Sequence, residues 1–486
     1  TLFTSFRLNC DYIFYGIVAM NIHVETDCLL RPTQLSKPSF CRKIFGVEFL
    51  MFLYGIIDLT ESSVMKQFIY HKVKLCLDFF ENEVSGNACN YSHSNATEKY
   101  QSDKVQYLSL NYVMGISLGF SIAVLFTSPF HLIVARRFGR RILIIYSGIG
   151  FFIKSVCECL LIFRNWSLDA FIYIETLYGL TGGAMILYSV CFSLLANASK
   201  VENRNLRIVC GVIASALGAA IGSVSTGYMI KTYGFLPPFI VATIISVGCV
   251  SYPIFCLEKS KPEIEEKLDL KPTILEFSEI LFSAKNILSS FTVVLLMFGF
   301  FYVGETAASE ILYYILMSYP ICMNSIQIGY SISLEILVLN IGLILSGTIL
   351  NKYLNELVVI LICLSFGLLF NIQMIYAKTV KSIYIAFGSN VLSSSAFPFI
   401  KGYLSKLTAP NLQTYLFIGL TVLEVFLGCL SKSVVIILYQ RTLEDYQETV
   451  YLILTCFTGV AFMLSLLIGI STLNHHLKLK IEHQET

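Results

Sequence analysis

Charged residues are scarce in this sequence. Only 14% of its 486 residues are Asp, Glu, Lys or Arg, whereas 56% are hydrophobic. Soluble domains carry about 25% charged residues, because a water-exposed surface needs them. The composition therefore argues against a soluble fold and favours a chain that lies mostly within a membrane.

Several functional motifs are missing as well. The sequence has no Gly-x-x-x-x-Gly-Lys-Ser/Thr phosphate loop, so we expect no ATPase activity. It has no His-Glu-x-x-His motif and no Gly-x-Ser-x-Gly motif, so we expect neither an enzyme nor a metal site. The net charge of +2 comes without a basic stripe interleaved with aromatics, and we expect neither a nucleic-acid partner nor a cofactor.

Long apolar runs are what the sequence does contain. A membrane-spanning helix needs about 20 mostly apolar residues. Twelve segments meet this need, and twelve spans place both ends of the chain on one side of the membrane. The predicted spans are 44–66, 107–134, 142–163, 170–196, 208–230, 238–257, 288–317, 328–350, 357–377, 383–403, 413–440 and 450–471.

Lysine and arginine collect in one set of connecting segments. Examples are the four arginines in 136–141, the lysines of the stretch 258–286 and those near the C-terminus. Because short cytosolic loops are enriched in Lys and Arg, this asymmetry predicts cytosolic N and C termini. Residues 1–43 then form a cytosolic segment, 67–106 a long external loop and 472–486 a cytosolic tail. The apolar run 12–20 also resembles a signal-peptide core, although it is too short to span a bilayer.

The polar stretch 258–286 divides the spans into two sets of six. It separates an N-terminal part, 44–257, from a C-terminal part, 287–471. Many transporters consist of two such repeats around a central site. The sequence therefore predicts an all-α membrane protein with twelve transmembrane helices in two six-helix halves.

Two loops at equivalent places in these halves look alike. They are Ala135–Arg141, after the second span, and Gly347–Leu354, after the eighth. Both resemble the major facilitator loop signature, whose charges link helices at the cytosolic face. We expect a cytosolic gate here, although the first loop could be an ordinary basic cytosolic loop. The gate residues would be Gly139, Arg140, Arg141, Gly347, Asn351 and Lys352.

Several short stretches show a closer resemblance. They include Tyr319–Cys322, Phe397–Leu407, Asn197–Arg207 and the loop around Cys89. These stretches resemble the proton-coupled folate transporter family, which has the major facilitator fold. The family includes folate importers and relatives that handle other organic anions, muropeptides or cyclic dinucleotides. The resemblance also implies a disulfide between Cys89 and Cys322.

The departures from the family affect its coupling residues. Arg136 and Val212 replace two acidic residues of the folate carriers, and Glu305 replaces a coupling histidine. Lys401 stands at the substrate-side basic position. The resemblance therefore implies the scaffold but not an intact folate site. Two glycosylation sequons, at Asn90 and Asn95, lie in the predicted external loop.

Ionisable residues inside a span are functional candidates by default. Glu305 and Glu310 lie in the seventh span, where either could couple protons or serve as a hydrogen-bonded structural group. Lys401 follows a predicted kink at Pro398, where it could bind an anion or reach toward the cytosolic interface.

The first and third spans add further candidates. Lys154 and Glu158 are four residues apart, which predicts an ion pair on one helix face. Asp58 and Glu61 share a face of the first span, and we assign them to the substrate site, with Lys154 or Lys401 as possible partners. Glu335 and Glu424 are secondary candidates.

These patterns favour a secondary active transporter. We expect it to move a small organic, anionic solute with protons by alternating access, as a monomer surrounded by membrane lipid. The plasma membrane and the endolysosomal membrane are both compatible with the sequence. The alternative is a transport-inactive relative that serves as a receptor or scaffold, because several coupling residues are replaced.

Overall fold

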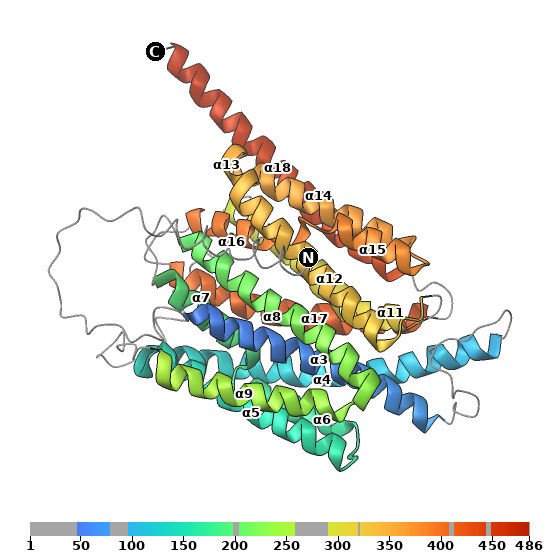
Figure 1. The fold of residues 1–486 in the computed structure, drawn as a ribbon. Helices are drawn as coiled ribbons and strands as arrows, with labels where there is room; N and C mark the ends of the chain where they lie inside the picture. Colours follow the sequence, from blue (N-terminus) through green and yellow to red (C-terminus); the bar gives the residue numbers. More distant parts are fainter. Residues whose placement is uncertain are drawn as a thin grey trace, which may run out of the picture. The chain divides into compact units, whose positions relative to one another are not determined.

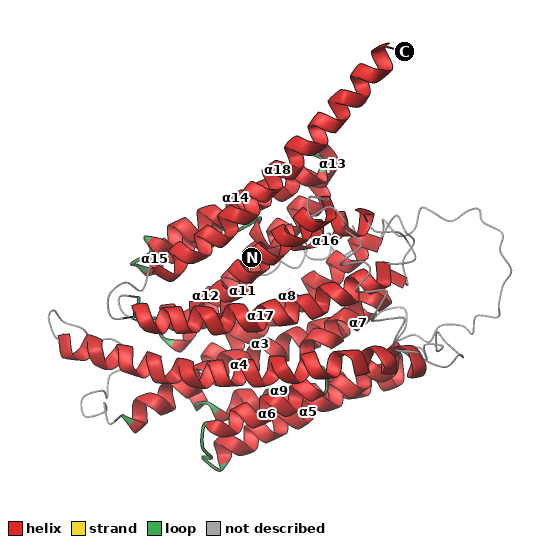
Figure 2. Cartoon of the chain, turned by 180° about the vertical axis from the view of Figure 1, so that it is seen from behind, coloured by secondary structure: helices red, strands yellow, loops and turns green. Residues whose placement is uncertain are grey.

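The computed structural model describes residues 46–77, 96–197, 204–257, 290–318, 321–407, 413–443 and 449–485. Within these ranges the chain is helical and contains no strand (Figures 1 and 2). We call residues 46–257 the N-terminal half and residues 290–485 the C-terminal half. The predicted segment 1–43 and the linker 258–286 lie outside the described residues.

The N-terminal half supplies the first six predicted spans. Five of them are long and apolar enough to cross a membrane. The exception is α3, which is 30 residues long but carries Asp58, Glu61 and Lys66 near its middle. The helices are α3 (Val47–Cys76), α4 (Ala96–Phe138), α5 (Arg140–Phe163), α6 (Asp169–Leu180), α7 (Gly183–Asn197), α8 (Arg204–Tyr233) and α9 (Leu236–Cys256).

The C-terminal half supplies six more segments of spanning length and composition, which makes eleven in the described chain. Together with α3 they correspond to the twelve predicted spans, and the count of twelve stays a prediction. The helices are α11 (Ser290–Met317), α12 (Ser325–Leu345), η2 (Ser346–Leu350), α13 (Asn351–Tyr353), α14 (Glu356–Ile375), α15 (Val380–Ser389), η3 (Ser393–Ser395), α16 (Ala396–Leu407), α17 (Gln413–Thr442) and α18 (Thr449–Glu485).

Two predicted spans are interrupted. Between α6 and α7 the chain turns at Gly182 and Gly183, whose φ angles of +89° and +56° suit glycine. Between α15 and α16 the short helix η3 intervenes, and Pro398 lies in the first turn of α16, where proline is tolerated. The break at the predicted kink is thus real, and it lies just before the proline.

Helices extend past three of the predicted spans. α3 continues to Cys76 and α4 begins at Ala96, so both ends of the predicted external loop 67–106 are helical. α18 continues as a helix to Glu485, through most of the predicted tail 472–486. The assignment of these segments to the two sides of the membrane stays a prediction. These extensions contain neither glycine nor proline, so nothing in them stops a helix.

The two halves share one hydrophobic core at the end of the helices that bears Cys322. This core contains Phe68 and Phe171 from the N-terminal half and Tyr314, Phe387 and Tyr439 from the C-terminal half. Two further clusters each contain residues of one half only. Apolar contact between the halves is therefore concentrated at the end that we predict to be external.

Hydrogen bonds cross between the halves as well. Tyr439 donates to Gln106 Oε1 at 3.0 Å, and Gln440 donates to Asn111 Oδ1 at 2.9 Å, both between α17 and α4. Nearer the opposite end the hydroxyls of Ser189 and Thr421 lie 3.4 Å apart. These contacts join α17 of the C-terminal half to α4 and α7 of the N-terminal half.

Candidate functional site

Close packing fixes the position of α3, which carries three of the intramembrane charges. α3 and α8 run side by side (Figure 1). A Cβ atom on Gly55 would lie 1.9 Å from the carbonyl oxygen of Ser215, and one on Gly218 would lie 2.1 Å from that of Phe52. Gly218 and Gly222 therefore allow the backbones to approach, as small residues do in membrane helices.

The first group of charges surrounds Lys154 on α5. Its Nζ lies 2.8 Å from Glu175 Oε1 on α6, 3.4 Å from Glu61 Oε2 on α3 and 4.0 Å from Glu158 Oε1 on α5. The hydroxyl of Ser155 donates a hydrogen bond to Glu61. The predicted pair with Glu158 is present only at the outer limit of an ion pair, and Glu175 is the closest partner.

This group holds more carboxylates than ammonium groups. Three glutamates share one lysine, and all four side chains are less than 10% exposed. The rings of Tyr178 and Phe151 lie 4.7 Å and 5.5 Å from Lys154 Nζ and add cation–π attraction. Buried charges without partners are costly. Protonation of a glutamate or binding of a cation would therefore stabilise this group.

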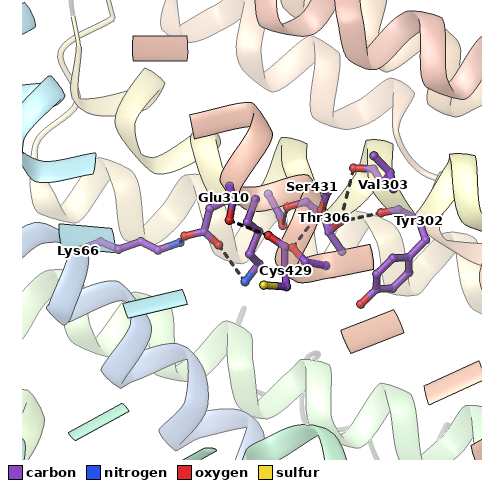
Figure 3. A network of polar contacts seen from close by, with 11 residues as sticks. Lys66, Tyr302, Val303, Thr306, Glu310, Cys429 and Ser431 are labelled. Carbon is purple, nitrogen blue, oxygen red and sulfur yellow. Dashed lines mark hydrogen bonds and ion pairs between the residues drawn. The ribbon is translucent and has the colours of Figure 1, made fainter. Parts of the chain in front are cut away.

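The second group joins the two halves through Glu310 on α11. Glu310 Oε1 lies 2.9 Å from Lys66 Nζ on α3, and Glu310 Oε2 lies 3.1 Å from Lys432 Nζ on α17. Figure 3 shows Lys66 reaching Glu310, with Thr306 and Ser431 beside them. The Lys66 ammonium also lies 4.8 Å from the centre of the Tyr313 ring. The carboxylate of Glu310 therefore forms ion pairs with two lysines.

Glu305 has a different environment, although it lies on the same helix. It accepts a hydrogen bond from the hydroxyl of Ser393 in η3, and it interacts electrostatically with Glu335 on α12. No Lys or Arg of the described chain lies within ion-pair distance of Glu305. Its charged form is therefore stabilised by a hydroxyl group rather than by a cation.

Lys401 pairs with a carboxylate of its own half. Its ammonium contacts Glu424 on α17, and it lies 5.8 Å from the centre of the Phe298 ring. Its side chain is 32% exposed. The predicted role in anion binding requires that the substrate compete with Glu424, and it stays a prediction. Asp58 is half-buried and interacts electrostatically with Lys154 rather than forming a close pair.

The two loops with the major facilitator signature differ in structure. Gly139 has a φ of +88° and connects α4 to α5. Arg141 donates to the carbonyl oxygens of Pro253, at 2.9 Å, and Ile254. It thereby binds the C-terminal end of α9, where helix carbonyls lack partners. Arg140, next to it, is half-buried.

The second loop begins within η2. Gly347, Asn351 and Lys352 are all exposed, and Lys352 Nζ lies 5.6 Å from the centre of the Tyr353 ring. Among the described contacts of the two loops, those of Arg141 link α5 to α9. Their role in a cytosolic gate stays a prediction.

Sequence reasoning missed three of the paired residues. Lys66, Glu175 and Lys432 lie within predicted spans, and they pair across helices in the structure. The signal was present, since each is an ionisable residue inside an apolar segment. Their partners lie on other helices, so no spacing along the sequence indicates which residues pair.

The structure describes one of the two cysteines of the predicted external disulfide. Cys322 is disulfide-bonded and has a positive φ of 49°. Cys89, Asn90 and Asn95 lie outside the described residues. The pairing of Cys89 with Cys322 and glycosylation at the two asparagines stay predictions.

Comparison with known proteins points to one family of membrane proteins. The model of the Major Facilitator Superfamily matches residues 96–430. The chain is 22% identical over 442 residues to a lysosomal proton-coupled steroid conjugate and bile acid symporter from Gallus gallus, covering 87% of this chain and 91% of the relative. It is 22% identical over 435 residues to the proton-coupled folate transporter of Rattus norvegicus, with the same coverage. The resemblance predicted from short motifs is confirmed.

Solved structures show the same fold. The human organic anion transporter MFSD10 matches with a TM-score of 0.61 at 14% identity, covering 88% of this chain and 99% of that one. The transporter FucP in its outward conformation matches with a TM-score of 0.57 at 12% identity, covering 87% and 97%. At these identities the likeness concerns the fold alone, and it confirms the predicted all-α membrane fold.

Proposed function

The chain belongs to the Major Facilitator Superfamily, and we propose that it carries a small organic anion across the membrane together with protons. It is a multi-pass membrane transporter and not an enzyme, as its family and relatives show. The comparisons give no support to a transport-inactive receptor or scaffold. Two relatives bear names that specify proton coupling with folate or with steroid conjugates and bile acids, and both solute classes are organic anions.

The environment of Glu305 carries the proposal of proton coupling. A carboxylate that pairs with a lysine exchanges protons only when the pair breaks, whereas Glu305 has a hydroxyl partner and no cation in the described chain. It can therefore gain or lose a proton without breaking an ion pair. Glu310 is less suited to this task, because two lysines hold it. We assign proton coupling to Glu305, where the resembled family has a histidine.

The distribution of contacts between the halves supports alternating access. The shared core near Cys322 packs the two halves together at the predicted external end. Away from this end, each half has a hydrophobic cluster of its own. Rocking of one half against the other would separate the shared core and expose the central charges to the outside. We place the N and C termini in the cytosol, the protein as a monomer in lipid, and the membrane as plasma or endolysosomal.

Uptake into proteoliposomes tests this function. We expect the wild-type protein to accumulate a steroid sulfate, a conjugated bile acid or folate when the outside is acidic. One pH unit stores about 1.4 kcal/mol per proton, which corresponds to roughly tenfold accumulation. Glu305→Gln should abolish this accumulation while leaving the exchange of solute across the membrane.

The matched control is Glu356→Gln, which neutralises a carboxylate paired with Lys406 at the exposed end of α14. It should accumulate solute as the wild-type protein does. Proton coupling through Glu305 is wrong if the Glu305→Gln variant still concentrates solute with undiminished dependence on external pH.

A further inference from the structure

Glu310 is held between two lysines that come from different halves of the molecule. Lys66 belongs to α3 of the N-terminal half, whereas Lys432 belongs to α17, in the same half as Glu310. Each ammonium contacts a different carboxylate oxygen, at 2.9 Å and 3.1 Å. Glu310 thus acts as a bridge, and the bond to Lys66 is the one that crosses between the halves.

The charges in this group do not balance. Two ammonium groups face one carboxylate, and within the membrane an unbalanced charge is costly. Beyond Glu310, Lys432 interacts electrostatically with Glu175 and Asp58, which lie farther away and offset the second positive charge. Among the described residues, Glu310 is the carboxylate within ion-pair distance of both lysines, so an anion that contacts both lysines must take its place.

We propose that Lys66 and Lys432 form a clamp for the negatively charged group of the transported solute, a carboxylate or a sulfate. Glu310 occupies this clamp when solute is absent, and the solute displaces it. The proposal rests on the transport function proposed above, and it names the part of the site that recognises the charge of the solute.

Neighbouring side chains suit the binding of an anion. The hydroxyls of Thr306 and Ser431 lie 2.8 Å apart, one helical turn before Glu310 and directly before Lys432 (Figure 3). Each hydroxyl also hydrogen-bonds a backbone carbonyl oxygen of its own helix, that of Tyr302 for Thr306 and that of Gly428 for Ser431. Both can therefore accept from a lysine, and either would have to leave its carbonyl partner to donate to an anionic oxygen. Lys432 is 32% exposed and Lys66 only 7%, so Lys432 is the more accessible of the two lysines.

The clamp couples binding to closure of the external end. When the halves separate there, the Lys66–Glu310 contact must break, while Glu310 keeps Lys432 because both belong to one half. An anion that contacts both lysines would draw α3 toward α17 again. Binding of the solute would thereby favour the state in which the shared core near Cys322 is closed, which is how a ligand shifts a conformational equilibrium.

Equilibrium binding to the purified full-length protein tests the clamp without any proton gradient. The probes are a steroid sulfate, a taurine-conjugated bile acid and folate, each measured at one fixed pH. Lys66→Gln and Lys432→Gln should each weaken binding of the bound anion at least about tenfold, since a hydrogen bond to a charged group contributes about that much. Lys432→Arg should retain most of the affinity.

Glu310→Gln gives the decisive result, because it removes the competing charge. The clamp predicts that this variant binds the anion more tightly than the wild-type protein. A purely structural bridge predicts the opposite or no change, and that outcome overturns the proposal. If Glu310→Gln does not fold, Glu310→Asp replaces it, since a shorter carboxylate fills the clamp less well and should also bind the anion more tightly.

Two control variants distinguish an effect on the clamp from other causes of altered anion binding. Lys406→Gln removes a lysine whose ion pair with Glu356 is largely exposed, and it should leave binding unchanged. Glu356→Gln, which removes the partner of Lys406, should also leave binding unchanged. The binding assay uses no proton gradient, so a failure of proton coupling leaves this test intact. If the wild-type protein binds none of the three anions, the clamp is wrong even if the protein transports another solute with protons.

Discussion

At the scale of single residues, Lys154 has three carboxylate partners within ion-pair distance among the described residues. Its ammonium approaches Glu175, Glu61 and Glu158, which come from three helices of the N-terminal half. The four side chains are buried, so water cannot replace a lost partner. Lys154 therefore holds α3, α5 and α6 together by neutralising part of their negative charge.

We expect Lys154→Met to destabilise the protein strongly. Removing one member of a buried charge group leaves the others without compensation, which costs about 3–5 kcal/mol. The thermal unfolding midpoint of the purified protein should fall accordingly. The additional substitution Glu175→Gln should restore part of the loss, because it removes the carboxylate closest to the missing ammonium.

Lys406→Met is the control for this prediction. Its pair with Glu356 is exposed on the lysine side, and exposed ion pairs contribute less than about 1 kcal/mol. Equal unfolding midpoints for Lys154→Met and Lys406→Met would show that the central group contributes no more than a surface pair.

At the scale of helices, α3 combines tight packing with an unusual number of charges. Its charges exclude it from the helices that are recognisable as spans by composition, and its glycine contacts bring it against α8. Asp58, Glu61 and Lys66 are tolerated because α5, α11 and α17 supply groups of opposite charge. α3 therefore has the least typical composition for a membrane span, and it contributes a residue to each of the two groups of buried charges.

We expect Gly218→Ala to weaken the packing of α8 on α3. The added methyl group would lie 2.1 Å from the Phe52 carbonyl oxygen, so the helices must separate. Overpacking of this kind costs about 1–3 kcal/mol, which should lower the thermal unfolding midpoint.

The same change at Gly469 is the matched comparison. Gly469 lies in α18 and has no atom within 4 Å of the added position. Alanine favours helix over glycine by about 1 kcal/mol, so Gly469→Ala should be neutral or stabilising. A Gly218→Ala variant as stable as Gly469→Ala would contradict the close approach of α3 and α8.

At the scale of the whole molecule, the two halves are joined most firmly near Cys322. The shared core and the α4–α17 hydrogen bonds lie toward this end. If this end is external, the described structure has its outer side closed. The orientation rests on the distribution of Lys and Arg, and it can be measured directly.

We expect epitope tags within 258–286 and after residue 486 to face the cytosol. A tag within residues 78–95 should face outward, because the Lys and Arg asymmetry puts this loop outside. Antibody labelling of intact cells should detect only the last tag, and permeabilised cells should show all three. Labelling of the 258–286 tag in intact cells would reverse the predicted orientation.

Features that depend on local composition could be predicted from the sequence alone. Apolar runs predicted where the helices cross the membrane, since burial of apolar residues in lipid is decided segment by segment. Short motifs were enough to identify the family. The sequence also showed that Glu305, Glu310, Lys154 and Lys401 are unusual, because a charge inside an apolar run is visible without a structure.

The pairing of the buried charges could be read only from the packed structure. Lys154 and Glu158 were paired by helical spacing, yet the closest partner of Lys154 is Glu175 on another helix. Glu310 and Lys66 are far apart in the chain and belong to different halves, but they lie 2.9 Å apart. The physical reason is that spacing along one helix specifies a face, whereas an ion pair depends on how separate helices pack, and the sequence of either helix alone does not contain that arrangement.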